Sequence, residues 1–305
     1  THEIYDTYGA TCNCSSWCDA SLSLAPTPKL RRRRCLGLSS TPYCVTAGTY
    51  RSSPACVYKY IIINRLSRPV IDKNRGWHIM KKLDSNMMKK AAKKLVEELD
   101  DSVNFYKIGL ELMMTGEYFD LLDWMLEREK QVFADLKFFD IPATVGAAVS
   151  RLKNRGASFV TVHGNQSIKE AAAANKGDTM TVLGVTALTS LDRGDLDDLG
   201  FNCDIDELVL SRAKRALEAG CDGVISSGME VAKLREQINT KLLVITPGIR
   251  PVDNKPSEDQ KRVVTVTQAF KNGADYIVVG RPIRDADHPR EAAEAIQDSI
   301  AGCFQ

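Results

Sequence analysis

The sequence predicts an α/β protein with the fold of a (β/α)8 TIM barrel, preceded by an irregular or disordered N-terminal extension. Two patterns favour this fold. From residue 84 onward, short apolar runs alternate strictly with segments of helical periodicity. The apolar runs are uninterrupted, as in parallel strands that are covered on both faces. Eight such strand–helix units over roughly this chain length are typical of a closed barrel, whose site lies at the carboxyl ends of the strands.

The first helix of the barrel is predicted over residues 86–99, where apolar residues recur at helical spacing and Ser85 or Asn86 is placed to cap the helix. Seven further strands are then predicted over residues 103–108, 132–137, 158–163, 180–188, 223–226, 242–246 and 276–279. The helices that follow them are predicted over residues 117–129, 142–154, 166–175, 205–219, 228–238 and 265–273 and from Pro289. One more strand before the first helix, ending near Asp84, completes eight units.

That first strand is atypical. Lys81 and Lys82 precede Asp84, and two adjacent lysines in a strand buried on both faces are costly unless they are paired. Residues 60–64 are an alternative source for this strand.

The N-terminal extension is predicted over residues 1–75 and the barrel domain over 76–305. Residues 1–70 hold nine Lys and Arg against three Asp and Glu, and six of the nine cysteines fall within the first 56 residues. This segment lacks a sustained period and the paired C-x2-C spacing of a zinc site. A solvated tail, a targeting segment or a stretch foreign to the functional protein all remain open for it.

The charge and hydropathy of the chain limit the classes of partner that it can have. The remainder of the chain is mildly acidic, with no global field for nucleic acid, and no apolar run approaches the length of a membrane span. Three scattered cysteines beyond the extension are ordinary in a reduced compartment. We therefore expect a cytoplasmic protein that acts on a small molecule and engages neither nucleic acid nor membrane.

The segment from Phe133 to Pro142 concentrates charge at the end of a predicted core strand. Alternate side chains of a strand share a face, so Asp135 and Lys137 are expected to point the same way, with Asp140 following as the strand ends. Charges packed this closely in a core are costly unless they pair or perform chemistry. This segment is therefore the candidate catalytic site.

A phosphate site is predicted at the ends of the last two strands. In barrels of this kind, the loops after strands seven and eight often hold a phosphate. Gly248 and Gly280 let backbone N–H groups approach the phosphate, and Arg250 and Arg281 offer bidentate donors. A phosphate grip on one side and the charged cluster on the other indicate a phosphorylated small molecule that reacts at its far end.

Five motifs in order make the chain resemble the orotidine 5′-phosphate decarboxylase family. They are Asp135-Leu136-Lys137-Phe138-Phe139-Asp140-Ile141-Pro142, Val162-His163, Leu188-Thr189-Ser190, Thr246-Pro247-Gly248-Ile249-Arg250-Pro251 and Val279-Gly280-Arg281-Pro282-Ile283. The similarity runs over about residues 83–303. The resemblance implies a carboxy-lyase that converts orotidine 5′-monophosphate to UMP in pyrimidine nucleotide biosynthesis, without a metal or organic cofactor.

The resemblance also implies roles for the residues that match. Lys137 would protonate C6 as CO2 leaves, beside Asp135, and Lys107 and Asp140 would complete an alternating network of charges. Asp140 and Thr144 would reach into the site of the other subunit, which implies a homodimer. Residues implied to bind the substrate are Asp84 and Lys107 at the ribose hydroxyls, Thr189 at the pyrimidine edge, and Arg250, Gln260, Gly280 and Arg281 at the phosphate, with Gln260 on a closing loop. His163 is expected to pack rather than to react.

Two alternatives stay open. Related sugar-phosphate decarboxylases and aldolases share an Asp-x-Lys-x-x-Asp strand but use magnesium; the segment 246–251 and Gln260 favour the nucleotide enzyme. The second alternative is an inactive barrel that binds nucleotide through its last two strands but lacks turnover because the first unit is defective.

Overall fold

The computed structural model describes residues 85–238, 241–250 and 262–304. The chain divides into two units, Thr1–Tyr50 and Arg51–Gln305, and every described residue belongs to the second. The predicted extension, the atypical first strand with Asp84, and Gln260 all lie outside the described residues.

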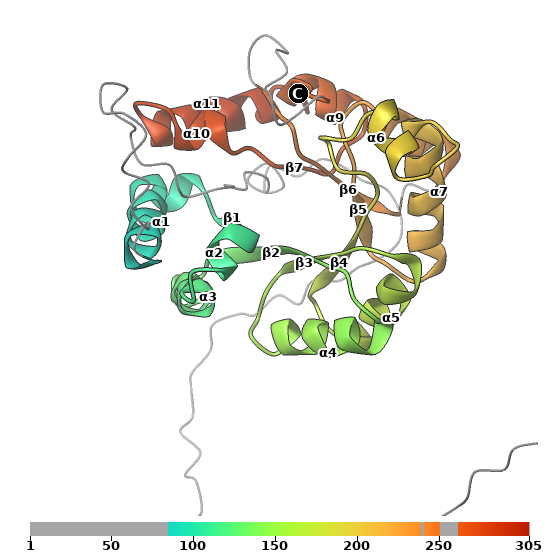
Figure 1. The fold of residues 1–305 in the computed structure, drawn as a ribbon. Helices are drawn as coiled ribbons and strands as arrows, with labels where there is room; N and C mark the ends of the chain where they lie inside the picture. Colours follow the sequence, from blue (N-terminus) through green and yellow to red (C-terminus); the bar gives the residue numbers. More distant parts are fainter. Residues whose placement is uncertain (1–84, 239–240, 251–261, 305) are drawn as a thin grey trace, which may run out of the picture. The chain divides into compact units, whose positions relative to one another are not determined.

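The described part of the chain forms one sheet of seven parallel strands in sequence order, curled with the helices on its outer side (Figure 1). The strands are β1 Phe105–Gly109, β2 Gln131–Phe138, β3 Phe159–Val162, β4 Thr181–Val185, β5 Gly223–Ile225, β6 Leu243–Thr246 and β7 Tyr276–Ile277. Each pairs in parallel with the next strand of the sequence, as seven consecutive units of a β/α barrel do. The predicted fold class is confirmed.

Helices follow the strands and cover the sheet. Those of six residues or more are α1 Ser85–Leu99, α3 Tyr118–Leu126, α4 Pro142–Lys153, α5 Asn165–Asn175, α6 Arg193–Asp198, α7 Ile205–Glu218, α8 Val231–Gln237, α9 Val266–Lys271 and α11 Pro289–Ala301. The shorter ones are η2 Asp100–Ser102, α2 Leu110–Met113 and α10 Arg281–Arg284. Within the described residues, no helix has the length and apolarity needed to cross a membrane.

Local chemistry sets several helix starts. Pro142 and Pro289 stand at the first helical positions of α4 and α11, where a missing N–H costs nothing. A reciprocal capping box opens α6: the Asp195 N–H donates to Asp192 Oδ1 at 3.1 Å, and the Asp192 N–H donates to Asp195 Oδ2 at 2.8 Å. These caps fix where each helix leaves the loop that precedes it.

Helix α1 lies between the last and first units of the curled sheet. It packs against α11, and its Lys89 reaches Asp120 of α3 at 2.9 Å as well as Glu117 just before that helix. This is the place of the helix that precedes β1 in a β/α barrel. The atypical first strand, which lies outside the described residues, stays a prediction.

The core has two layers. Side chains along each strand point alternately to the outer layer and to the inner layer, and this alternation positions the residues of the site. The large outer cluster lies between sheet and helices, and it includes Ala134 and Leu136 of β2. The inner cluster contains Phe105, Phe133 and Phe159 from β1, β2 and β3, with ring centroids of Phe105 and Phe159 4.8 Å apart. Because side chains alternate along a strand, the inward positions two residues further on carry polar side chains above this aromatic layer.

Candidate active site

A cavity of about 710 Å³ opens at the carboxyl ends of the strands. Its walls come from the ends of β1 and β2, the loop after β4, the segment after β6 and the segment after β7. The predicted site residues that line it are Lys107, Asp135, Lys137, Thr189, Arg250, Gly280 and Arg281. Residues far apart in the sequence therefore meet at the end of the barrel where the site was predicted.

Three charged side chains form an array on the inner face of β1 and β2. Lys107 Nζ donates to Asp135 Oδ2 and Lys137 Nζ donates to Asp135 Oδ1, both at 2.6 Å. Lys107 and Asp135 are buried, and Lys137 is half-buried with its side chain 31 % exposed toward the cavity. A single carboxylate thus lies between two ammonium groups, and the array carries one net positive charge.

Burial and charge act in opposite directions on this array. Burial alone raises the pKa of Asp135, but the ammonium groups of Lys107 and Lys137 outweigh burial and hold that pKa well below its ordinary value. Burial lowers the pKa of Lys107, against the opposing effect of Asp135. Asp135 is therefore ionised at neutral pH, and its carboxylate holds the two ammonium groups in fixed positions.

The backbone of Lys137 departs from strand geometry. Its φ of +49° lies in the left-handed region, which non-glycine residues rarely adopt. The pairing of β2 with β3 shifts register between Ala134 and Phe138, so Lys137 stands in a bulge. The buried hydroxyl of Thr161 on β3 accepts the Lys137 N–H at 2.9 Å and donates to Asp135 Oδ1 at 3.0 Å.

Arginines gather on the other side of the cavity. Arg250 and Arg284 both line the cavity together with Arg281. Gly248 has φ +81°, and a Cβ there would lie 2.8 Å from the carbonyl oxygen of Arg262. Only glycine therefore lets the segment after β6 run this close to its neighbour, and guanidinium groups suit the planar, bidentate recognition of phosphate.

A buried ion pair joins the arginine side of the cavity to the loop after β4. Arg262 donates to Glu230 Oε1 at 2.6 Å and to the Leu188 carbonyl at 2.8 Å. Both side chains are almost fully buried, and burial raises the pKa of Glu230 despite the guanidinium beside it. Because Thr189 follows Leu188, this pair fixes one wall of the cavity relative to the other.

The charge on the cavity wall is positive overall. The basic lining residues in the described part are Lys107, Lys137, Arg250, Arg281 and Arg284, and the acidic ones are Glu111 and Asp135. A cavity with this excess of positive charge attracts a small anion. In the described part of the chain, no group of three or more histidine, cysteine, aspartate or glutamate side chains is arranged to hold a metal ion.

Comparison with known proteins identifies the family of this fold and site. A family model described as orotidine 5′-phosphate decarboxylase / HUMPS family matches residues 82–296. The chain belongs to this family. The family predicted from the sequence, and with it the carboxy-lyase class, are confirmed.

This chain is similar to relatives named orotidine 5′-phosphate decarboxylase over most of their length. The protein of Methylococcus capsulatus is 64% identical over 213 residues, which are 70% of this chain and 88% of that protein. The protein of Stenotrophomonas maltophilia is 49% identical over 210 residues, which are 68% of this chain and 87% of that protein.

Solved structures of the family share the fold. The enzyme of Lactobacillus acidophilus superposes with a TM-score of 0.61 at 36% identity, over 69% of this chain and 93% of that one. The enzyme of Pyrococcus horikoshii superposes with a TM-score of 0.56 at 27% identity, over 70% of this chain and 95% of that one.

Two residues that the family resemblance assigns to the site lie away from the cavity of their own chain. Asp140 and Thr144 are exposed at the start of α4, and neither lines the cavity. Asp140 Oδ1 accepts the N–H of Ile141 at 2.6 Å. The neighbouring side chains of Phe139 and Ile141 are also exposed. Within one chain, the alternating network therefore has three members, and the fourth faces outward.

Sequence reasoning missed three polar residues of the site. Arg284 and Glu111 line the cavity, and Thr161 lies beneath the charged array. The i+3 spacing of Arg284 from Arg281, across the turn of α10, could have indicated the first. Thr161 carries no such signal, because a threonine in an apolar run is typical of any strand.

Proposed function

We propose that the protein converts orotidine 5′-monophosphate to UMP and CO2, with Lys137 as the proton donor. The observation that carries this proposal is the position of Asp135 between two ammonium groups, in the same cavity as three arginines. The bond from C6 to the carboxylate carbon breaks, its electron pair stays on C6, and CO2 departs. The proton for C6 comes from Lys137 Nζ, so atoms and charge balance without a co-reactant.

The charged array suits this chemistry for electrostatic reasons. Charge develops on C6 in the transition state, and a fixed ammonium stabilises it without reorganisation. Asp135 would lie beside the departing carboxylate, where like charges raise the energy of the bound substrate but not of the transition state. Lys107 keeps Asp135 ionised and, with Asp84, would bind the ribose hydroxyls.

The arginine side of the cavity would hold the phosphate. Arg250, Gly280 and Arg281 would bind it, with Gln260, and Thr189 would bind the pyrimidine edge. The phosphate is remote from the reacting carbon. Its binding energy can therefore hold the substrate against the electrostatic strain at the other end.

The site would be completed by a second copy of the chain. Asp140 and Thr144 face outward beside exposed Phe139 and Ile141, so they can reach a neighbouring subunit but not the cavity of their own chain. A partner's Asp140 would add the fourth charge beside Lys137. We therefore propose a homodimer with shared sites, acting in the cytoplasm on a small molecule, without nucleic acid, membrane or cofactor.

A turnover assay tests the proposal. Purified protein is incubated with orotidine 5′-monophosphate, and the loss of its absorbance is followed with and without EDTA. Equal turnover in both arms supports the cofactor-free decarboxylase. Turnover that EDTA abolishes would favour a metal-dependent reaction, and binding of UMP without turnover would favour an inactive nucleotide-binding barrel.

A further inference from the structure

Thr161 is a fully buried side chain that joins the two residues at the centre of the charged array. Its hydroxyl donates to Asp135 Oδ1 at 3.0 Å and accepts the backbone N–H of Lys137 at 2.9 Å. A hydroxyl has one proton and two lone pairs, so both bonds form at once. Thr161 does not line the cavity, and it contacts the array from the buried side.

The bond to the main chain falls where the strand is irregular. Ala134 pairs with Val160 and Phe138 pairs with Val162, so three residues of β2 stand opposite Thr161 alone. A bulge of this kind leaves backbone groups without ladder partners. The Thr161 hydroxyl serves as the acceptor for Lys137, the residue whose φ of +49° departs from strand geometry. The side chain thus supports the bulge at its most strained residue.

We propose that Thr161 is a positioning residue for the decarboxylation. Its hydroxyl fixes the main chain of Lys137 and the carboxylate of Asp135 with respect to each other, so that the ammonium of Lys137 is aimed before the substrate binds. The inference rests on the proposed function, because it assigns a role in the reaction of the same site. Thr161 itself does not contact the reacting atoms.

The substitutions that test this role separate the hydroxyl from the volume of the side chain. Thr161→Val keeps the shape and removes the hydroxyl, whereas Thr161→Ser and Thr161→Ala differ from each other only by the hydroxyl. Thr186→Val is the matched control, since Thr186 is also buried and donates its hydroxyl to the Ile225 carbonyl at 2.7 Å, away from the array.

We expect Thr161→Val to lower kcat by about 100-fold, the effect of displacing a catalytic group by about an ångström, with little change in KM. Thr161→Ser should retain most of kcat, Thr161→Ala should lose it as Thr161→Val does, and Thr186→Val should resemble the wild type. The affinity for UMP should be unchanged in all four, because the cavity stays intact. If Thr161→Val does not fold, the comparison of kcat between Thr161→Ser and Thr161→Ala tests the role of the hydroxyl.

A crystal structure of Thr161→Val provides a readout that is independent of turnover. The inference predicts that φ of Lys137 leaves the left-handed region or that Lys137 Nζ separates from Asp135. The inference would be overturned if Thr161→Val kept Lys137 in place and kcat unchanged. It would also be overturned if Thr161→Val lowered the melting temperature as much as Thr186→Val does, without any loss of kcat. A wild type without turnover would instead refute the proposed function, and with it the role of Thr161 in decarboxylation; the position of Lys137 in the variant would then show only whether Thr161 fixes the main chain of Lys137.

Discussion

Lys107 Nζ lies 2.6 Å from Oδ2 of Asp135, which leaves Oδ1 of the same carboxylate to the other ammonium of the array. Because Lys107 neutralises Asp135 from the buried side, the ammonium of Lys137 is not needed as its counter-ion. A proton donor must release its proton without leaving a buried carboxylate unpaired. The division of one carboxylate between two cations meets this condition.

The first prediction concerns Lys137. Lys137→Ala should remove the proton donor and lower turnover by at least the roughly 10²- to 10⁴-fold that a general acid contributes. The fold should persist because Asp135 keeps its bond to Lys107. Turnover is measured with orotidine 5′-monophosphate, and far-UV circular dichroism checks the fold. Lys214→Ala, an exposed position on α7, is the control. Near-normal turnover of Lys137→Ala would remove the proposed donor.

The second prediction concerns Asp135 and its dependence on pH. Asp135→Asn leaves two ammonium groups without their anion, and breaking a buried pair in this way costs about 3–5 kcal/mol of unfolding free energy. The folded-state pKa of Asp135 is depressed, so its stabilising effect is full above its ordinary pKa of 3.8 and is lost as the pH falls below it. The difference between wild type and variant should therefore shrink in acid.

Denaturant titrations at neutral pH and at about pH 3 measure this difference. Asp120→Asn is the control, because Asp120 forms an exposed pair with Lys89, and exposed ion pairs contribute little to stability. A difference for Asp135→Asn that grows in acid would contradict the assigned ionisation.

The strands were predictable because parallel strands covered on both faces leave uninterrupted apolar runs. The run over residues 132–137 became β2 Gln131–Phe138, and the run over 223–226 became β5 Gly223–Ile225. The run over 180–188 was read too long, since β4 ends at Val185. Ala187 and Leu188 stay apolar for a different reason: they leave the sheet and line the cavity.

The charged array could be predicted in membership but not in geometry. Strand alternation places Asp135 and Lys137 on one face, and both do line the cavity. The sequence does not predict the left-handed backbone of Lys137, because that conformation depends on the pairing of β2 with β3. The four-residue helices α2 and α10 were missed for a related reason, since so short a helix has no period to detect.

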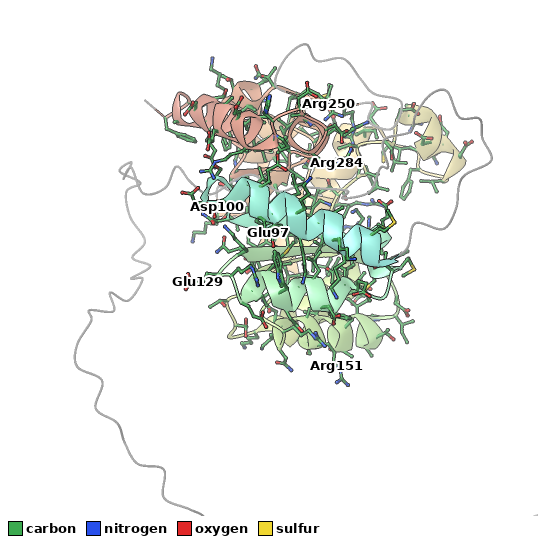
Figure 2. All side chains as sticks on the ribbon, turned by 90° about the vertical axis from the view of Figure 1, so that its left-hand side faces the viewer. Glu97, Asp100, Glu129, Arg151, Arg250 and Arg284 are labelled. Carbon is green, nitrogen blue, oxygen red and sulfur yellow. The ribbon has the colours of Figure 1, made fainter. Side chains whose placement is uncertain are left out.

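The third prediction concerns the phosphate end of the cavity. Arg281→Ala should weaken UMP binding by roughly 1.5–3 kcal/mol, the value of a charge-assisted hydrogen bond. Orotidine without its phosphate should bind poorly to the wild type and be nearly insensitive to the substitution. Calorimetric titration of both ligands measures the effect, with Arg151→Ala on the outer side of α4 as the control (Figure 2). Equal losses for both ligands would place Arg281 elsewhere.

The fourth prediction concerns His163, which follows β3. Burial lowers the pKa of His163 from 6.5 to about 4, with Arg212 and Lys137 adding to the lowering and Asp135 opposing it. Between these two values, the unfolded chain holds more protons than the folded chain. The free energy of unfolding therefore falls as the pH is lowered through this window.

Replacing the imidazole ring of His163 should remove its part of this fall in the free energy of unfolding. His163→Gln should lose less stability than the wild type between about pH 7 and about pH 5, as measured by denaturant titration at both pH values. His288→Gln, at an exposed histidine before α11, is the control substitution. A variant of His163 with an undiminished loss in acid would show that another group titrates in this window.

The last prediction tests whether two chains share a site. Asp140 is exposed and does not line the cavity of its own chain, whereas Lys137 does. Lys137→Ala and Asp140→Ala should therefore each be inactive as pure homodimers, for the first lacks the donor and the second lacks the partner's carboxylate. In a mixed dimer, one site combines both defects and the other combines two intact residues.

Mixing the two inactive variants should thus restore turnover, at a level set by the fraction of mixed dimers. The control is a mixture of Lys137→Ala with Asp135→Asn: both residues belong to the array within one chain, so every site of a mixed dimer keeps one defect. Recovery in the first mixture and none in the second would assign Asp140 to the neighbouring subunit. Failure of the first mixture, with mixed dimers demonstrated by two affinity tags, would mean that Asp140 does not complete the site of the neighbouring subunit.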